Sequence, residues 1–246
     1  MWFLISRISF FVFMKVPAKK FGEGDARLKV FTSWSGGKES CLACYKAKSA
    51  GFDVSYLLNV ISEDGTRSRA HGLRSDLLVL QAEAIGIPII QVKSTWNSYE
   101  TKFKEAAMDL KHKGLKGGVF GDIDLQEHKD WVDKVCSEVG VESIEPLWRY
   151  DPKAVLTEFV NSGFKAIVIN VKADLFGEDW LGRELNAQFI ADLPDTIHPC
   201  GEHGEYHTFV LDGPLFQQRV ELLSSNTELK DGNWLLDISE YTLSAK

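Results

Sequence analysis

The stretch LKVFTSWSGGKES at residues 28–40 decides the fold of this chain. Its β-branched and aromatic side chains predict a strand over 28–34. Gly36 and Gly37 then let the backbone approach an anion closely, and the helix expected over 38–48 presents free N–H groups in its first turn. Lys38 adds a cation, and the hydroxyls at 35 and 40 add donors. The stretch therefore predicts a strand, a phosphate-binding loop and a helix.

The loop does not fit the P-loop pattern of Gly, four residues and Gly-Lys-Ser/Thr, because Thr32 stands at the first glycine position and Glu39 follows the lysine. Residues 35–40 (SGGKES) resemble instead the SGGxDS loop of the ATP pyrophosphatase (PP-loop) superfamily, with Glu39 at the aspartate position. This resemblance implies cleavage of ATP between the α and β phosphates, with AMP activating a carboxylate or carbonyl oxygen. An inert Gly-Gly turn is the alternative.

Apolar runs and helical stripes alternate after the loop. Strands are expected over 54–60, 87–92 and 117–121, and helices over 71–85, 99–113 and 126–139. Strands separated by single helices require right-handed crossovers and a parallel sheet covered on both faces. The sequence therefore predicts an α/β fold with a doubly wound, mainly parallel sheet. Ligands in such sheets bind beyond the carboxyl ends of the strands, which points to loops 35–38, 62–71, 93–96 and 122–128.

The second half of the chain changes character. It begins with a helix expected over 152–162 and a strand over 166–171, and it ends with strands over 205–211 and 216–223 and a hairpin around Asp231 and Gly232. We therefore expect an N-terminal extension over 1–27, an ATP-binding domain over 28–144 and a smaller α+β C-terminal substrate-binding domain over 145–246.

Composition restricts the class of protein. The chain has 246 residues with 44% hydrophobic and 26% charged side chains, which is typical of a globular protein. Its net charge of −7 argues against general nucleic-acid binding. Four scattered cysteines make no disulfide framework and favour a reducing compartment, so a cytoplasmic location is expected.

The extreme N-terminus is almost wholly apolar over residues 2–13. This stretch lacks a signal-peptide cleavage site and is too short to span a bilayer, which takes about 20 apolar residues. Translation from Met14 is our interpretation, and no membrane association is expected. The oligomeric state stays open, with a homodimer among the alternatives.

Two further segments of the first half carry candidate site residues. Asp122 follows the strand over 117–121 and is a candidate for metal or nucleotide binding. For Asp124 the alternatives are a role in the site and a simple helix N-cap. His71 follows a loop with Arg67 and Arg69, a basic cluster that could neutralise pyrophosphate or lie solvated.

The second half carries the other candidates. Glu202 and Glu205 lie in the stretch GEHGEYHT at residues 201–208, where two carboxylates and two imidazoles precede an apolar strand. They could grip a cationic substrate or act as general bases. Arg183, in WLGR at residues 180–183, suits stacking or anion recognition.

The cysteines raise a metal alternative. Cys41 and Cys44, one helical turn apart, could join Cys200 and His203 in a zinc site, or could carry sulfur. Both pairs lack the usual knuckle glycines, and small apolar side chains one turn apart are typical of a helix core. We interpret Cys41 and Cys44 as buried small hydrophobes.

Several segments together resemble the diphthine–ammonia ligase family, in the same order over residues 28–220. They are SGGKES (35–40), LQAEAIGIPI (80–89), PLW (146–148), WLGR (180–183), GEHGEYHTF (201–209) and DGPLF (212–216). The combination of the loop with the GEHGEYHT segment is specific to this family, whereas either part alone is not.

The resemblance implies ATP-dependent amidation of diphthine, a modified histidine of elongation factor 2, with ammonia and through an acyl-adenylate. It implies a PP-loop domain plus a smaller C-terminal domain. In this family reading, ATP would bind Ser35, Gly36, Gly37, Lys38, Ser40 and His71. Mg²⁺ would bridge to Glu39 or Asp122, and these two residues together with Lys38 would form the catalytic set. The substrate would face Glu202, Glu205, Tyr206 and Arg183. Two alternatives remain: a PP-loop enzyme that adenylates another carboxylate or a tRNA base, and a non-catalytic ATP- or AMP-sensing module.

Overall fold

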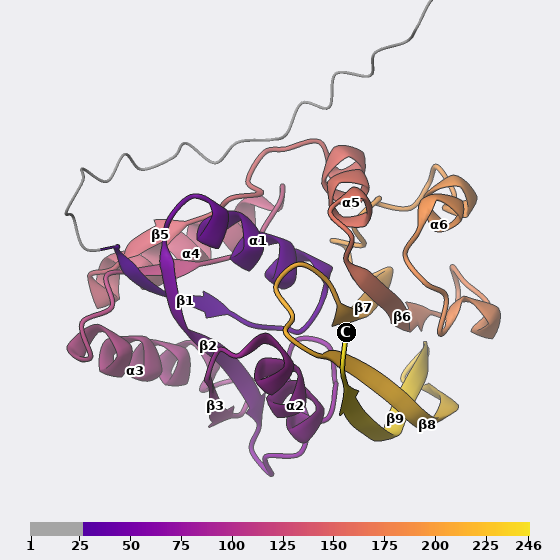
Figure 1. Cartoon of the computed structure of the whole chain (residues 1–246), viewed down its shortest axis with the longest axis horizontal. Coiled ribbons are helices and arrows are strands. Elements are labelled where there is room, and N and C mark those ends of the chain that lie inside the picture. The colour runs from indigo at the N-terminus through magenta and orange to yellow at the C-terminus, as the bar shows by residue number, and fades with distance from the viewer. Residues whose placement is uncertain (1–26) are drawn as a thin grey trace, which may run out of the picture.

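The computed structural model describes residues 27–246, in which two β-sheets lie side by side with helices around them (Figure 1). The apolar stretch over 2–13 and the interpretation of Met14 as the start lie outside the described residues.

The first sheet has five parallel strands in the order β3-β2-β1-β4-β5. The strands are β1 (Lys29–Ser33), β2 (Asp53–Ser62), β3 (Ile89–Ser94), β4 (Gly117–Val119) and β5 (Glu142–Ile144). The helices between them are α1 (Lys38–Ser49), α2 (Ser75–Ile85), α3 (Tyr99–His112) and α4 (Gln126–Val139). This arrangement confirms the predicted doubly wound α/β sheet.

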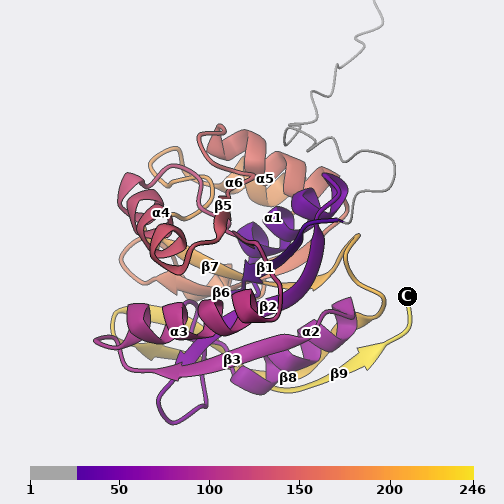
Figure 2. The ribbon, with the colours of Figure 1, turned by 90° about the vertical axis from the view of Figure 1, so that its left-hand side faces the viewer.

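Alternation along β1 explains why both faces of the sheet are covered. Val30 points into the cluster that contains Leu42 of α1 and Leu77 of α2. Its neighbour Phe31 points the other way, into the cluster that contains Phe103 of α3 and Val132 of α4. Successive side chains of a strand face opposite sides, so an apolar strand needs a helical layer on each side. Figure 2 shows these layers from the side.

The second sheet is antiparallel, with strand order β7-β6-β9-β8. Its strands are β6 (Lys165–Lys172), β7 (Tyr206–Asp212), β8 (Arg219–Lys230) and β9 (Asn233–Ser244), accompanied by α5 (Pro152–Asn161), the 3₁₀ turn η1 (Glu178–Trp180) and α6 (Ala187–Asp192). The β8–β9 hairpin turns at Asp231 and Gly232, whose φ angles of 50° and 78° are those of a tight two-residue turn. The hairpin and the smaller α+β C-terminal part are as predicted.

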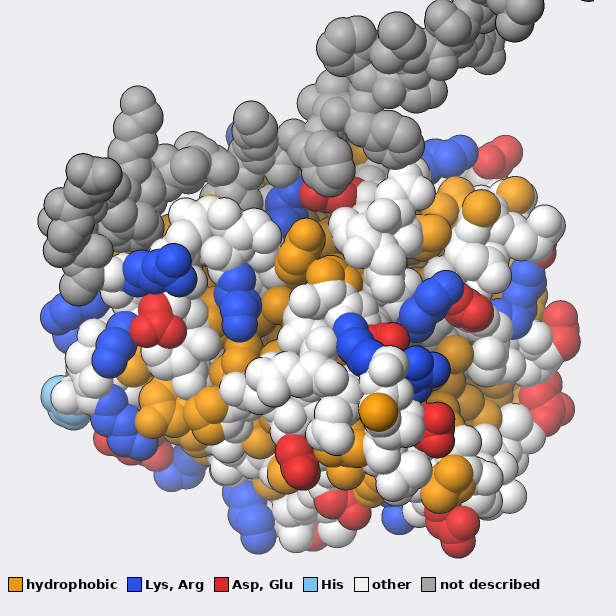
Figure 3. All heavy atoms as spheres, in the orientation of Figure 1, with side chains coloured by type: hydrophobic (Ala, Val, Ile, Leu, Met, Phe, Trp, Pro, Cys, Tyr) orange, Lys and Arg blue, Asp and Glu red, His pale blue; other side chains and the backbone are white. Residues whose placement is uncertain are grey.

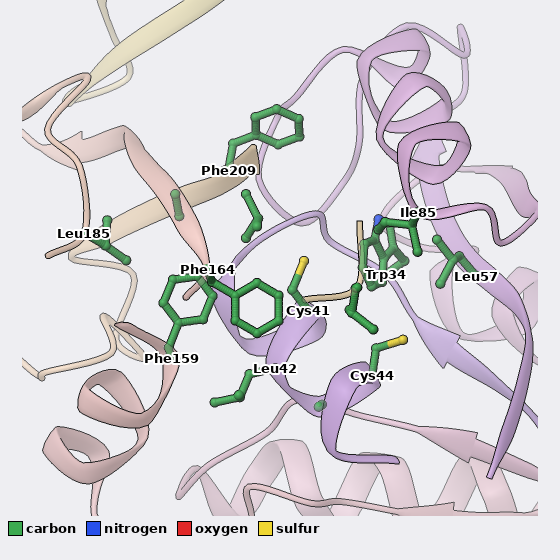
Figure 4. Packing of buried hydrophobic residues seen from close by; sticks show 14 of the residues in the cluster. Trp34, Cys41, Leu42, Cys44, Leu57, Ile85, Phe159, Phe164, Leu185 and Phe209 are labelled. Carbon is green, nitrogen blue, oxygen red and sulfur yellow. The ribbon is translucent and has the colours of Figure 1, made fainter. Parts of the chain in front are cut away.

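One core joins the two sheets (Figure 4). Phe159 of α5 and Phe164 stack with their ring centroids 4.9 Å apart, in the same buried cluster as Leu42 of α1. Cys41 and Cys44 are 0% exposed within this cluster, which confirms their interpretation as buried small hydrophobes. Burial raises the pKa of both thiols, to about 11 for Cys44. The division of the chain at 145 stays a prediction.

The structure corrects several predicted bounds. The helix predicted over 71–85 begins at Ser75, because Ser68 N–H donates to the Leu73 carbonyl and a bridge pairs Arg67 with Arg74. His71 therefore lies in a loop. Strand β8 begins later and ends later than predicted, since it pairs with β9 along its whole length. The short elements β5 and α6 were not predicted.

Charged side chains of both signs lie interspersed on the face seen in Figure 3, and neither sign covers it. Among the described residues, no helix has the length and apolar character needed to cross a bilayer.

Candidate active site

The phosphate loop connects the end of β1 to the start of α1. Gly36 has φ +80°, and a side chain there would collide with Leu78 and Gln81 of α2, so only glycine fits. Ser35 Oγ accepts the Gly37 N–H at 3.2 Å and donates to Ser40 Oγ at 3.1 Å. The Ser40 hydroxyl lies 3.0 Å from the Gly37 carbonyl, to which it can donate. These contacts hold the loop in a defined shape with both hydroxyls at its mouth.

Strand β7 of the second sheet docks on this loop. Val210 N–H donates to the Gly36 carbonyl at 3.0 Å. The amide of Gln81 donates to the same carbonyl at 3.0 Å and to the Val210 carbonyl at 2.7 Å. Thr208 Oγ1 accepts the Lys38 backbone N–H at 3.1 Å. The loop is therefore shaped by both halves of the chain.

The Lys38 side chain is only 4% exposed and is held by three groups. Its Nζ lies 2.7 Å from Glu39 Oε1, donates to the Cys200 carbonyl at 2.7 Å and lies 4.4 Å from the centroid of the Tyr206 ring. Burial lowers the pKa of Lys38, but Glu39, Tyr206 and Cys200 together outweigh burial, and the pKa is raised. Lys38 is therefore a fixed positive charge beside the phosphate loop.

A cavity of about 420 Å³ opens beside Lys38. Eight predicted site residues line it: Ser35, Lys38, Glu39, Ser40, His71, Asp122, Glu202 and Tyr206. Gly36 and Gly37 belong to the loop beneath it. The volume lies within the usual range of small-molecule sites, roughly 300–1,000 Å³. Residues as far apart in the sequence as Ser33 and His207, which are separated by 174 positions, thus line one cavity.

The carboxylates of Glu39, Asp122 and Glu202 line this cavity and together form its acidic wall. A Cβ at Gly121 would lie 2.9 Å from the Glu39 carbonyl carbon, and this close approach brings the end of β4, with Asp122, against α1. Asp122 Oδ1 lies 3.2 Å from His128 Nδ1, and this contact raises the pKa of His128. Burial, followed by the nearby Glu39, raises the pKa of Glu202 to about 8. The wall accordingly favours cations.

His71 stacks on His207 of β7, beside the phosphate loop. The rings of His71 and His207 lie 4.6 Å apart at an interplanar angle of 28°. Burial, together with His207 and Lys38, holds the pKa of His71 well below its usual value. Burial and Lys38 lower the pKa of His207 to about 4. Both imidazoles are therefore neutral at physiological pH.

Two predicted substrate-binding residues do not line the cavity. Glu205 is 5% exposed, and its carboxylate accepts the backbone N–H groups of His198 at 3.1 Å and His203 at 2.9 Å, so it holds a turn in place. Arg183 pairs with Asp192, and its guanidinium carbon lies 4.2 Å from the centroid of the Trp180 ring.

Sequence reasoning missed other groups around the cavity. Thr208, the Cys200 carbonyl and His198 contact the site residues named above, and Tyr99 and Trp131 line the cavity. None of the residues of the predicted loop 93–96 lines it. Apolar periodicity carries no signal for such residues.

Among residues 27–246, no group of three or more His, Cys, Asp or Glu side chains is arranged to hold a metal ion.

Comparisons with known proteins agree along the chain. Residues 28–143 match the model of the diphthamide synthase N-terminal domain, and residues 151–243 match that of its C-terminal domain. A protein of Schizosaccharomyces pombe named diphthine–ammonia ligase is 31% identical over 223 residues, which cover 79% of this chain but 36% of that protein. Proteins of the same name from Danio rerio and Homo sapiens are 29% and 25% identical, and the matches cover 78% and 80% of this chain and 86% and 84% of those proteins.

The chain thus spans about a third of the length of the S. pombe relative and most of the length of the vertebrate relatives. The two family models follow one another in the order of the two sheets, and the residues that enclose Lys38 come from both matched segments. On these grounds the chain belongs to the diphthamide synthase family.

Proposed function

We propose that this protein is an ATP-dependent amide ligase that converts diphthine on elongation factor 2 to diphthamide with ammonia. One observation carries the proposal: the phosphate loop and an acidic wall face the same cavity, and both halves of the chain build it. The names of the relatives suggest the reaction. The cavity is lined by Lys38 of the loop and by the carboxylates of Asp122 and Glu202, which supports binding of an anion beside the first and of a cation beside the others.

ATP is proposed to bind through its phosphates to Ser35, Gly36, Gly37, Lys38 and Ser40, with His71 against the loop. The start of α1 supports this proposal because its N-cap residue, Gly37, has no side chain, and the first helical N–H, that of Lys38, is the one that Thr208 Oγ1 accepts. The positive end of the helix dipole can therefore act on a bound anion. Lys38 would stabilise negative charge on the phosphates.

Mg²⁺ is proposed to bind beside Glu39 and Asp122. The donor chemistry fits, because Mg²⁺ prefers oxygen ligands and commonly uses one or two carboxylates together with substrate phosphates and water. Both carboxylates line the cavity, and Gly121 packs directly on Glu39. A bound Mg²⁺ would neutralise phosphate charge.

The acceptor is proposed to enter from the acidic wall. Glu202 lines the cavity close enough to Glu39, Asp122 and Asp124 for their charges to affect its pKa, so a cationic group of the substrate would be stabilised there. Tyr206 lines the cavity, and Lys38 Nζ lies over its ring. Glu205 would support this wall through the turn that it holds, and Arg183 takes no direct part in the proposal.

The proposed reaction has two steps. A carboxylate oxygen of diphthine attacks the α-phosphorus of ATP, the bond to the bridging oxygen breaks, and pyrophosphate leaves. The nitrogen of ammonia then attacks the acyl carbon, AMP leaves with the former carboxylate oxygen, and a proton is released. Lys38, held by Glu39 and the Cys200 carbonyl, would keep its charge next to the phosphates throughout.

We also propose that the protein is cytoplasmic. The four cysteines are buried and form no disulfide, which is typical of proteins in a reducing compartment.

The proposal is tested by measuring AMP and pyrophosphate release from ATP by the purified protein. Diphthine-bearing elongation factor 2 and ammonium are added together, separately and not at all. Repeated turnover that requires both additions and an intact Lys38 is the expected result, whereas the factor without ammonium should release pyrophosphate for a single round only. AMP formation without dependence on the factor would point to another carboxylate or to a tRNA base, and ATP binding without AMP formation would point to a sensor.

A further inference from the structure

His198 occupies a distinctive place between the two halves of the site. Its side chain is 10% exposed, and Nε2 lies 3.0 Å from Asp124 Oδ2, at the start of the α4 segment. Nδ1 accepts the backbone N–H groups of Cys200 at 3.1 Å and Glu202 at 3.3 Å. One imidazole therefore contacts an acidic loop of the first half and a turn of the second half.

These contacts fix the tautomer of the ring. The backbone N–H groups of Cys200 and Glu202 can only donate, so Nδ1 must carry a lone pair. In the neutral imidazole the proton then lies on Nε2, where it donates to the Asp124 carboxylate. The turn can keep its two N–H···Nδ1 bonds only in this form.

The turn that His198 holds carries two groups of the site. The Cys200 carbonyl accepts the Lys38 ammonium at 2.7 Å, and Glu202 lines the cavity. Other contacts stiffen the same turn: Tyr206 Oη donates to the Pro199 carbonyl at 2.5 Å, and Glu205 accepts the backbone N–H of His198. A displacement of the ring would therefore move both the partner of Lys38 and the acidic wall.

We propose that His198 is a positioning residue, whose Nδ1 fixes the turn that presents the Cys200 carbonyl to Lys38 and whose Nε2–H fixes that turn against Asp124. The catalytic consequence rests on the proposed ligase activity. The positions of Lys38 and Glu202 matter because a misplacement of about 1 Å at a reacting centre can cost roughly 10²-fold in rate.

Two conservative variants separate the two nitrogens. In His198→Asn the amide oxygen replaces Nδ1 as an acceptor, so the turn survives but the contact with Asp124 is lost. In His198→Gln the amide nitrogen can replace Nε2–H, so the contact with Asp124 survives but the turn loses its acceptor. His198→Ala removes both. His112→Asn is the matched control, because His112 is an exposed residue in the last turn of α3 and does not line the cavity.

We expect His198→Gln to lower kcat and to weaken ATP binding by about tenfold or more, since it disturbs the partner of Lys38. His198→Asn should keep kcat within about threefold of the wild type and raise KM for the acceptor protein. Asp124→Ala should add nothing further in the His198→Asn background, because that contact is already absent. Melting temperatures of all variants are measured alongside.

Two measurements that do not depend on catalytic turnover test the role of His198 separately from the proposed function. In protein labelled with ¹⁵N-histidine, His198 should show a protonated Nε2 and an unprotonated Nδ1, and ATP titration should rank Gln and Ala below Asn. If the wild type releases no AMP, the ligase proposal fails while these two measurements still decide the inference. A protonated Nδ1, equal losses in all three His198 variants, or an additive effect of Asp124→Ala would overturn it.

Discussion

The ammonium group of Lys38 lies 2.7 Å from the backbone carbonyl oxygen of Cys200, 162 residues further along the chain. A lysine of the phosphate loop is thus positioned by the C-terminal half of the protein. Burial alone would lower the pKa of this lysine, and Glu39 together with Tyr206 and Cys200 reverses that effect. The position of this charge therefore depends on a contact that the loop cannot make by itself.

Replacing Lys38 with methionine should abolish most of the turnover. The variant keeps the length of the side chain but loses the charge aimed at the phosphates, so we expect AMP release to fall by about 10²–10³-fold. Initial rates of AMP formation at saturating ATP provide the measurement.

Lys46→Met is the matched control for this experiment. Lys46 is also buried, and its Nζ lies 2.7 Å from Glu158 Oε1, but it does not line the cavity. Breaking such a pair costs about 3–5 kcal/mol of stability. Both variants should therefore lose stability, and only Lys38→Met should lose turnover per folded molecule. Equal turnover in the two variants would argue against a role for the Lys38 charge.

Glu202→Gln should change how stability depends on pH above about pH 4.5. The pKa of Glu202 is about 8 in the folded protein against an ordinary value of 4.5. Between these values the folded state holds a proton that the unfolded state has released, so this contribution to stability is complete below pH 4.5 and is lost as pH rises to 8. It amounts to on the order of 4 kcal/mol.

Urea unfolding between pH 4.5 and 8 measures this effect. The glutamine variant should show a slope of unfolding free energy against pH that is more positive by one proton than that of the wild type. Parallel curves would mean that Glu202 is ionised throughout the range.

His207→Phe should change the pH dependence of stability in the opposite direction. The pKa of His207 is about 4 in the folded protein and about 6.5 ordinarily, so the unfolded state takes up a proton first as the solution is acidified. Wild-type stability is therefore lost as pH falls from 6.5 to 4, by on the order of 3 kcal/mol from this residue.

Phenylalanine cannot be protonated and can still stack on His71. The slope of unfolding free energy between pH 4 and 6.5 should accordingly decrease by one proton in this variant, while the contribution of His71 remains. An unchanged acid transition, followed by circular dichroism, would contradict the prediction.

Gly37→Ala should separate β7 from the phosphate loop. A Cβ at this position would collide with the His71 ring and lie 3.2 Å from the Thr208 carbonyl oxygen. Overpacking of this kind costs about 1–3 kcal/mol, and the displaced ring should also weaken ATP binding, as measured by calorimetric titration.

Adding His71→Ala to Gly37→Ala tests this steric explanation. Removal of the ring clears the collision, so the double variant should be more stable than the sum of the two single effects predicts. Strict additivity in thermal unfolding would show that the collision is not the cause.

Local patterns predicted the local parts of the fold. The run over 28–34 and the helix after Gly37 appear as β1 and α1, and α4 has the predicted bounds Gln126–Val139. Short elements such as β5 and α6 escaped prediction because three to six residues contain too little periodicity. The predicted start of α2 was wrong, because the backbone before Ser75 forms a bridge between Arg67 and Arg74 instead of a first helical turn.

The sequence by itself determined the phosphate loop, the parallel sheet that presents it and the two carboxylates Glu39 and Asp122 at the carboxyl ends of that sheet, because these follow from residues that are neighbours in the chain. Tertiary structure alone decided that the Cys200 carbonyl would hold Lys38, that His71 would stack on His207 and that His198 would bridge to Asp124. Such contacts join residues 74 or more positions apart. Their partners are selected by the burial and docking of whole sheets, which no local pattern specifies.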